Sequence, residues 1–135
     1  LARRGAVTHP AAMHLWGRMS SINVRKVVWT LQHLEQPFVR TDAGMAFGVV
    51  HTPAYRALNP NALVPTLQDG ELVLWESNAI VRYLCARYGA HTSSYPTDLA
   101  QRADADRWMD WQLSTISEPM RIAFWGLVRT PPDCR

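Results

Sequence analysis

The chain has 135 residues, of which 47% are hydrophobic, and a formal net charge of +3. This length is enough for one compact domain, or for one domain and part of another. The arginines are spread along the chain rather than clustered, so the charge does not indicate nucleic-acid binding. No apolar run approaches the ~18 residues of a membrane-spanning helix, and we expect no membrane insertion.

Cysteine and histidine positions narrow the possible chemistry further. Cys85 and Cys134 lie far apart and form no C-x-x-C pair or disulfide framework, which indicates a reducing, cytoplasmic compartment. We expect Cys85 to be buried as a small apolar residue. The histidines show no metal-ligand spacing, and we expect no metal cofactor. They are His9, His14, His33, His51 and His91.

The first part of the chain has the pattern of a βαβ unit. Residues 1–12 lack periodicity, and we expect a flexible N-terminal extension. Residues 13–17 predict a short strand, and apolar residues at helical spacing between 24 and 34 predict an amphipathic helix behind a capping serine. Residues 38–41 predict a second strand. A strand, a helix and a strand within about thirty residues are expected to pair the two strands in parallel.

A β-hairpin followed by a helix is predicted next. A short helical turn at 53–58 precedes two apolar runs, 64–67 and 72–75, which are separated by a segment containing Asp-Gly. An Asp-Gly pair between apolar runs is a strong hairpin signal. The helical pattern that follows has Ser77 as its expected N-cap and ends at Gly89. Together with the βαβ unit, these elements predict helices packed on one mixed, four-stranded sheet.

A helical region follows the predicted sheet. Residues 90–96 are small and polar and close with proline, which indicates a linker. Residues 97–135 predict a long helix that Pro119 kinks or divides, and we interpret them as the incomplete first part of an all-α domain. Residues 13–89 then form an α/β domain with the order β-α-β-α-β-β-α. The long helix carries more apolar surface than an isolated helix can bury, notably at Trp108, Trp111 and Trp125.

The turn into the helix after the hairpin combines groups that suit an amino-acid head group. The free N–H groups and the dipole at a helix start favour a carboxylate. Glu76, beside this helix start, would attract an ammonium. The residues alone also permit a simpler interpretation, in which Ser77 caps the helix and Glu76 is a solvated acid.

Two serines precede the first predicted helix. An ionised thiol placed there would gain from the helix dipole and from a hydroxyl donor supplied by Ser20 or Ser21. Asn23 could add an amide donor. No His or Asp stands near these serines in sequence, so a Ser-His-Asp hydrolase has no support. The alternative function for one of the two serines is an N-cap.

From residue 13 to about residue 132, the chain resembles soluble glutathione transferases of the bacterial theta-like or beta-like type. Several ordered motifs carry the resemblance, and their order and spacing make a chance match untenable. They are SSINVRKV at 20–27, NPNALVPTL at 59–67, WESNAI at 75–80, YPTDL at 95–99 and DRWMDWQ at 106–112.

The resemblance implies a thioredoxin-like N-terminal domain that binds glutathione, followed by an all-helical domain. It implies that the Val64–Pro65 bond is cis, with the backbone of Val64 pairing with the cysteinyl part of glutathione. Glu76 and Ser77 would hold the γ-glutamyl head group. Glutathione is then a co-substrate whose thiolate attacks a small electrophile, which is a detoxification reaction.

The resemblance also implies catalytic residues and a partner. In theta-like members the catalytic serine lies four residues before a basic residue, and counting back from Arg25 gives Ser21. Some bacterial relatives use a Thr-x-Asn pair, which maps to Ser21 and Asn23. The family forms homodimers, and Asp106 falls where a neighbouring subunit supplies an acid to the glutathione amino group. A surface or interface salt bridge is the alternative role of Asp106.

Two departures from the family pattern keep other functions open. Leu63 stands where some relatives have a lysine for the glycyl carboxylate, and Asn61 would substitute for it. The helical domain is expected to be incomplete, through a shortened protein, a frame-shifted gene or an incomplete family member. The alternatives are a glutathione-dependent peroxidase or disulfide reductase, a non-catalytic glutathione-binding or protein-interaction module, and a fragment that does not fold stably alone.

Overall fold

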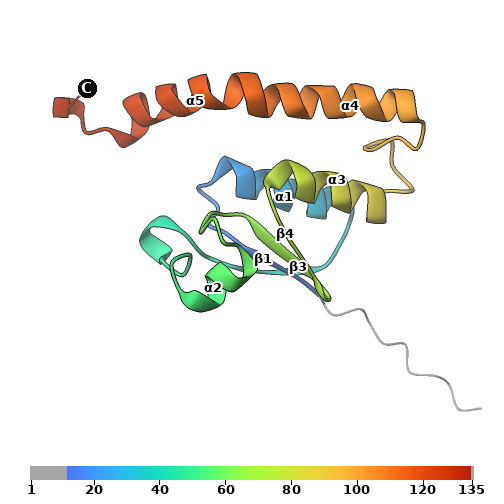
Figure 1. Cartoon of the computed structure of the whole chain (residues 1–135), viewed down its shortest axis with the longest axis horizontal. Helices are drawn as coiled ribbons and strands as arrows, with labels where there is room; N and C mark the ends of the chain where they lie inside the picture. The colour runs from blue at the N-terminus through green and yellow to red at the C-terminus, as the bar shows by residue number, and fades with distance from the viewer. Residues whose placement is uncertain (1–11, 135) are drawn as a thin grey trace, which may run out of the picture. The chain divides into compact units, whose positions relative to one another are not determined.

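The computed structural model of the chain describes residues 12–134 (Figure 1). The chain divides into two compact units, one ending at Ser93 and one beginning at Ser94. The expected N-terminal extension lies outside the described residues, apart from Ala12. The first unit contains β1 (Met13–Trp16), α1 (Ile22–His33), β2 (Phe38–Thr41), a 3₁₀ turn (Met45–Phe47), α2 (Pro53–Leu58), β3 (Thr66–Asp69), β4 (Leu72–Trp75) and α3 (Ser77–Tyr88).

The four strands form one mixed sheet in the order β2-β1-β3-β4. β1 pairs with β2 in parallel, as the βαβ pattern predicts, and pairs with β3 antiparallel. β3 and β4 form the antiparallel hairpin. Helices α1 and α3 lie on one face of the sheet, and α2 lies on the other (Figure 1). This arrangement confirms the expected α/β, thioredoxin-like architecture.

The hairpin confirms the Asp-Gly signal, but its first strand is shifted from the prediction. β3 begins at Thr66 instead of Val64 and continues to Asp69, which pairs with Leu72. Only two residues then connect the strands, beginning with Gly70 at a φ of 58°. The later start has a simple cause, because Pro65 has no N–H to donate to a neighbouring strand. Val64 and Pro65 are therefore available to form a turn ahead of the sheet.

The main core lies between the sheet and the helices α1 and α3. Each fully buried aliphatic side chain there contributes about 1.5–3 kcal/mol by removal from water. Cys85 belongs to the same buried set with 7% exposure, as predicted. The aliphatic side chains of this core with at most 1% exposure are Leu15, Val24, Val27, Leu31, Leu34, Leu67, Ile80 and Leu84.

A smaller cluster joins α2 to the opposite face of the sheet. Its buried members are Ala43, Val50 and Tyr55, of which Tyr55 is carried by α2. Trp16 and Val64 pack against this cluster from β1 and from the turn before β3. The cluster therefore fixes the segment around Val64 relative to the sheet.

The second unit is a long helical rod in which π-helical turns interrupt the α-helix. Asp98 caps α4 by accepting a hydrogen bond from the N–H of Gln101 at 2.9 Å. The predicted disturbance at Pro119 takes the form of the first π-turn, because proline cannot donate the hydrogen bond that an α-helix needs. The segments are α4 (Leu99–Trp111), a π-turn (Gln112–Ile116), α5 (Ser117–Phe124) and a second π-turn (Trp125–Arg129).

Among residues 12–134, no helix is both long and apolar enough to cross a membrane.

Candidate functional site

A pocket in the first unit collects residues from three turns that are far apart in sequence. One side comes from the start of α1, a second from the turn ahead of β3, and a third from the turn between β4 and α3. All five predicted glutathione-binding residues of the first unit lie here. The lining residues are Asn23, Asn59, Asn61, Leu63, Val64, Pro65, Trp75, Glu76 and Ser77.

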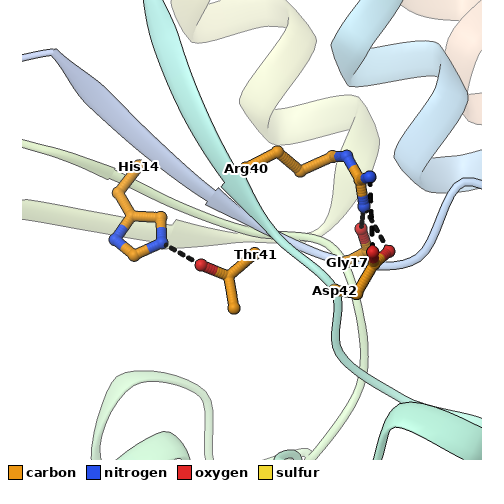
Figure 2. Close-up of polar contacts among 5 residues, drawn as sticks. All are labelled: His14, Gly17, Arg40, Thr41 and Asp42. Carbon is orange, nitrogen blue, oxygen red and sulfur yellow. Dashed lines mark hydrogen bonds and ion pairs between the residues drawn. The ribbon is translucent and has the colours of Figure 1, made fainter.

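The loop between β1 and α1 is tied to the end of β2. The N–H of Gly17 donates to the carbonyl of Thr41 at 2.9 Å, and the guanidinium of Arg40 donates to the carbonyl of Gly17 at 2.7 Å. Arg40 also pairs with Asp42, and Figure 2 shows it spanning the two groups. Gly17 has a φ of 152°, and a Cβ there would lie 2.4 Å from the side chain of Val24. The close approach of α1 to β1 therefore requires glycine.

Ser21 caps α1, which confirms the N-cap interpretation for one of the two serines. Its Oγ accepts a hydrogen bond from the N–H of Val24 at 3.5 Å. An N-cap hydroxyl acts as an acceptor, so its own hydrogen can still be donated to an anion. The capping role and the predicted thiolate-donor role are therefore compatible.

Asn23, two residues into the helix, is the member of the predicted catalytic pair that lines the pocket. Its side chain is exposed, and it lies among the pocket residues. Ser21 is half-buried and is not among them. The structure thus places Asn23 directly on the pocket and Ser21 at the N-terminus of the same helix.

The turn ahead of β3 contains the cis peptide bond between Val64 and Pro65 that the resemblance implied. Pro65 is buried and Val64 is half-buried against the α2 cluster. Leu63 is 63% exposed, so the pocket presents an apolar side chain at this position. Asn61 is exposed on the pocket, and its amide nitrogen donates to Asn59 Oδ1 at 3.2 Å.

In the turn between β4 and α3, the N-cap lies one residue earlier than predicted. The helix begins at Ser77, so Glu76 and not Ser77 occupies the N-cap position, and Glu76 makes no capping bond with its side chain. Glu76 has a φ of 71°, which is rare for a residue with a side chain. Such backbone strain is typical of functional sites. Ser77 is 7% exposed, in the first turn of α3 where amide groups are available to an anion.

A half-buried cation, Lys26, lies near the acid at this turn. The ammonium of Lys26 on α1 donates to Asn78 Oδ1 at 2.5 Å, and Asn78 is buried in the first turn of α3. Burial lowers the pKa of Lys26, while the nearby charge of Glu76 opposes that shift. The acidic Glu76, on the pocket, and the basic Lys26, behind it on α1, thus both lie near the start of α3. The arrangement offers separate positions for an ammonium and a carboxylate.

Asp106, the last predicted site residue, lies on α4 in the second unit. The hydroxyl of Tyr95 contacts both of its carboxylate oxygens at 3.2 Å. Tyr95 and Asp106 belong to two of the family-like motifs of this unit. Their contact fixes the carboxylate relative to the start of the unit.

Sequence reasoning missed three residues that support the pocket. Tyr55 appeared only as part of a short helix, and Asn59 and Thr66 only as parts of a longer motif. All three are buried and hydrogen-bonded to one another or to the carbonyl of Leu63. The available signal was the polar Asn59 directly before a proline, since a buried asparagine in a turn needs hydrogen-bond partners.

Comparison with known sequences gives one family. Residues 15–92 match the family model for the glutathione S-transferase N-terminal domain. The chain is 51% identical over 123 residues to glutathione S-transferase GstB of Escherichia coli K12, which covers 90% of this chain and 59% of that protein. It is 30% identical over 128 residues to glutathione S-transferase 1 of Manduca sexta, again covering 90% and 59%.

Solved structures give the same result. The theta class glutathione S-transferase of Xanthomonas axonopodis pv. citri, with glutathione bound, superposes with a TM-score of 0.88 at 54% identity, over 94% of this chain and 60% of that one. Poplar glutathione transferase F1 superposes with a TM-score of 0.82 at 27% identity, over 92% and 59%. The chain thus spans about three-fifths of the length of these relatives.

Proposed function

The chain belongs to the glutathione S-transferase family, and from that premise we propose that it binds glutathione and activates the thiol for attack on a small electrophile. Glutathione would lie in the pocket of the first unit. Its cysteinyl part would pair with the backbone of Val64 beside Pro65. This function accounts for the convergence of the three turns on one pocket.

The main support for the proposal is that the start of α3 offers one position for a positive group and one for a negative group. The γ-glutamyl head group of glutathione has an ammonium and a carboxylate. Glu76 suits the ammonium, and the first amide groups of α3, beginning at Ser77, suit the carboxylate. Asn61, which also lines the pocket, would contact the glycyl end, where Leu63 supplies no charge.

The chemical step requires a thiolate near the start of α1. Ser21 would donate its hydroxyl hydrogen to the sulfur, and Asn23 would add an amide donor from the pocket side. The dipole of α1 would stabilise the same negative charge and lower the pKa of the thiol. The thiolate then forms a C–S bond with the electrophile and displaces its leaving group.

The wider assignments follow the family. Residues 13–89 would form the glutathione-binding domain, residues 90–96 a linker, and residues 97–135 the first part of a helical domain. We place the protein in the cytoplasm as a homodimer, in which Asp106 of one subunit would contact the glutathione amino group of the other. The conjugation reaction would serve detoxification.

Calorimetric titration of glutathione into the 135-residue chain tests this function. Wild type should bind in the micromolar to millimolar range, about −8 to −4 kcal/mol. Glu76→Ala and Ser77→Ala should each abolish measurable binding, while Glu71→Ala, an acid in the hairpin loop away from the pocket, should bind as wild type. A folded wild-type chain that takes up no glutathione would refute the proposal.

Turnover distinguishes the enzymatic alternatives. A chloronitrobenzene should be conjugated faster than a hydroperoxide is reduced. The reverse preference would assign the chain to glutathione-dependent peroxidases or reductases, and binding without either reaction would indicate a non-catalytic module.

A further inference from the structure

Three buried side chains, closed through the carbonyl of Leu63, form a hydrogen-bonded ring beneath the turn that precedes β3. Tyr55 and Asn59 are each 2% exposed, and Thr66 is fully buried. Tyr55 comes from α2, Asn59 follows that helix, and Thr66 begins β3. The ring therefore joins α2 to the sheet at the position of the pocket.

Asn59 uses its complete hydrogen-bonding capacity within this turn. Its amide nitrogen donates to the carbonyl of Leu63 at 3.0 Å and to Thr66 Oγ1 at 3.1 Å. Its amide oxygen accepts from the backbone and side-chain nitrogens of Asn61, at 3.0 and 3.2 Å. A primary amide has two hydrogens to donate and two lone pairs to accept. Asn59 thus touches the pocket but has no group left over for a ligand.

The direction of the remaining hydrogen bonds follows by elimination. The hydroxyl of Tyr55 donates its single hydrogen to the carbonyl of Leu63 at 2.6 Å. In the contact between Tyr55 and Thr66 at 2.8 Å, Thr66 must therefore be the donor. Burial raises the pKa of Tyr55, so its hydroxyl keeps this hydrogen at neutral pH.

Together these hydrogen bonds fix the orientation of the peptide plane between Leu63 and Val64. The carbonyl of Leu63 accepts two hydrogen bonds, one from Tyr55 and one from Asn59, and is fixed toward the ring. The N–H of Val64 belongs to the same planar trans peptide unit and points in the opposite direction. Holding the carbonyl of Leu63 therefore also sets the direction of the Val64 N–H.

We propose that the ring of Tyr55, Asn59 and Thr66 is a positioning device that orients the Val64 amide for the cysteinyl backbone of glutathione. This inference rests on the proposed function. The three residues act through the Leu63–Val64 peptide and make no contact with the reacting sulfur. Their loss should weaken glutathione binding, because a rotated peptide plane misdirects the donor on which binding depends.

Thr66 and Tyr55 permit nearly isosteric tests. Thr66→Val and Tyr55→Phe remove one hydroxyl each, whereas Thr66→Ser keeps the hydroxyl and serves as the matched control. We expect the first two variants to raise the calorimetric Kd for glutathione roughly two- to tenfold, the effect of one hydrogen bond. Thr66→Ser should bind within about twofold of wild type.

A second readout separates positioning from stability. In ¹⁵N–¹H spectra of the folded proteins without glutathione, the Val64 amide signal should shift in Thr66→Val and Tyr55→Phe and stay in place in Thr66→Ser. Measurements are made well below each variant's thermal midpoint, so that a change in stability alone leaves Kd and the Val64 signal unchanged.

The outcomes identify which idea fails. Wild-type binding together with an unchanged Kd in both hydroxyl-free variants would overturn the positioning role and leave the proposed function standing. Equal weakening in Thr66→Ser would also overturn it, since the hydroxyl would then be irrelevant. Failure of wild type itself to bind glutathione would overturn the proposed function, and the positioning role with it.

Discussion

Glu76 holds a left-handed backbone conformation, with a φ of 71°, at the edge of the pocket. That conformation costs an L-residue roughly 1–2 kcal/mol, whereas glycine adopts it freely. An acid at a position that favours glycine is consistent with the proposed role of the carboxylate in binding glutathione. The charge of Glu76 also opposes the lowering of the Lys26 pKa that burial causes.

Comparing Glu76→Gly with Glu76→Ala separates strain from binding. Both variants lack the carboxylate and should lose glutathione binding to the same extent. The glycine variant should nevertheless be more stable than the alanine variant by about 0.5–1 kcal/mol in chemical denaturation, since only alanine retains the strain. Equal stabilities would mean that the backbone at Glu76 is not strained.

Ser21 combines a structural and a proposed chemical role, which two substitutions can separate. An alanine in place of a capping serine costs about 1 kcal/mol of stability, whereas a glycine costs a few tenths. If the hydroxyl activates the thiol, Ser21→Ala and Ser21→Gly should both lower kcat at least tenfold, with less than threefold change in glutathione affinity. Steady-state kinetics and denaturation measure the two effects. A fall in kcat with alanine alone would indicate that only the cap matters.

At the scale of elements, the hairpin is fastened to α3 by one carboxylate. Asp69, the last residue of β3, accepts hydrogen bonds from Tyr83 at 2.7 Å and Tyr88 at 2.5 Å. Burial, followed by the bond to Asp69, raises the pKa of both tyrosines above the usual value. A tyrosine with a raised pKa stabilises the fold in its protonated form.

This fastening predicts a loss of stability at alkaline pH. The contribution of both tyrosines is fully present below their unfolded pKa of about 10 and is lost as the pH rises through the higher folded values. The free energy of unfolding should therefore fall above about pH 10 in wild type, and less steeply in the Tyr83→Phe/Tyr88→Phe double variant. Denaturant titrations between pH 7 and 11 measure both slopes. Parallel slopes in the two proteins would contradict a role for these hydroxyls.

Most elements of the first unit were predictable because each has a local signal. Helix α1 follows its apolar spacing and its capping serine, and the hairpin follows Asp-Gly. The N-cap at Ser77 was predicted wrongly, because serine is a common cap and nothing local reveals the positive φ of Glu76. The predicted start of β3 lies two residues too early. The apolar run includes Val64 and Pro65, although proline has no N–H to donate to a neighbouring strand.

In the candidate site, too, some features could be predicted from the sequence and others could not. The pocket positions of Glu76 and Ser77 and the cis bond at Val64–Pro65 could be predicted, because the family-like motifs include them. The ring of Tyr55, Asn59 and Thr66 could not, because its hydrogen bonds join α2 to β3 and depend on tertiary structure. Long-range contacts of this kind leave no periodicity in the sequence.

At the scale of the whole molecule, the helices of the second unit present a large apolar surface. Among their described residues none is buried, and Trp108 and Trp111 pack edge to face with ring centroids 5.6 Å apart. This many exposed apolar side chains on one unit make it a candidate interaction surface for the proposed homodimer. Further exposed apolar side chains on these helices are Leu113, Met120, Ile122, Phe124, Trp125, Leu127 and Val128.

The proposed homodimer predicts how this surface behaves in solution. The chain should sediment as a dimer at micromolar concentration, and Trp108→Gln/Trp111→Gln should weaken dimerisation at least tenfold, because interfacial tryptophans commonly contribute 2 kcal/mol or more. Ile22→Gln on α1 removes an apolar side chain that is 71% exposed in the first unit, and it should leave dimerisation unchanged. Sedimentation equilibrium measures all three proteins. A wild-type chain that stays monomeric up to 100 micromolar would exclude the homodimer, since association weaker than about −5.5 kcal/mol cannot sustain a stable interface.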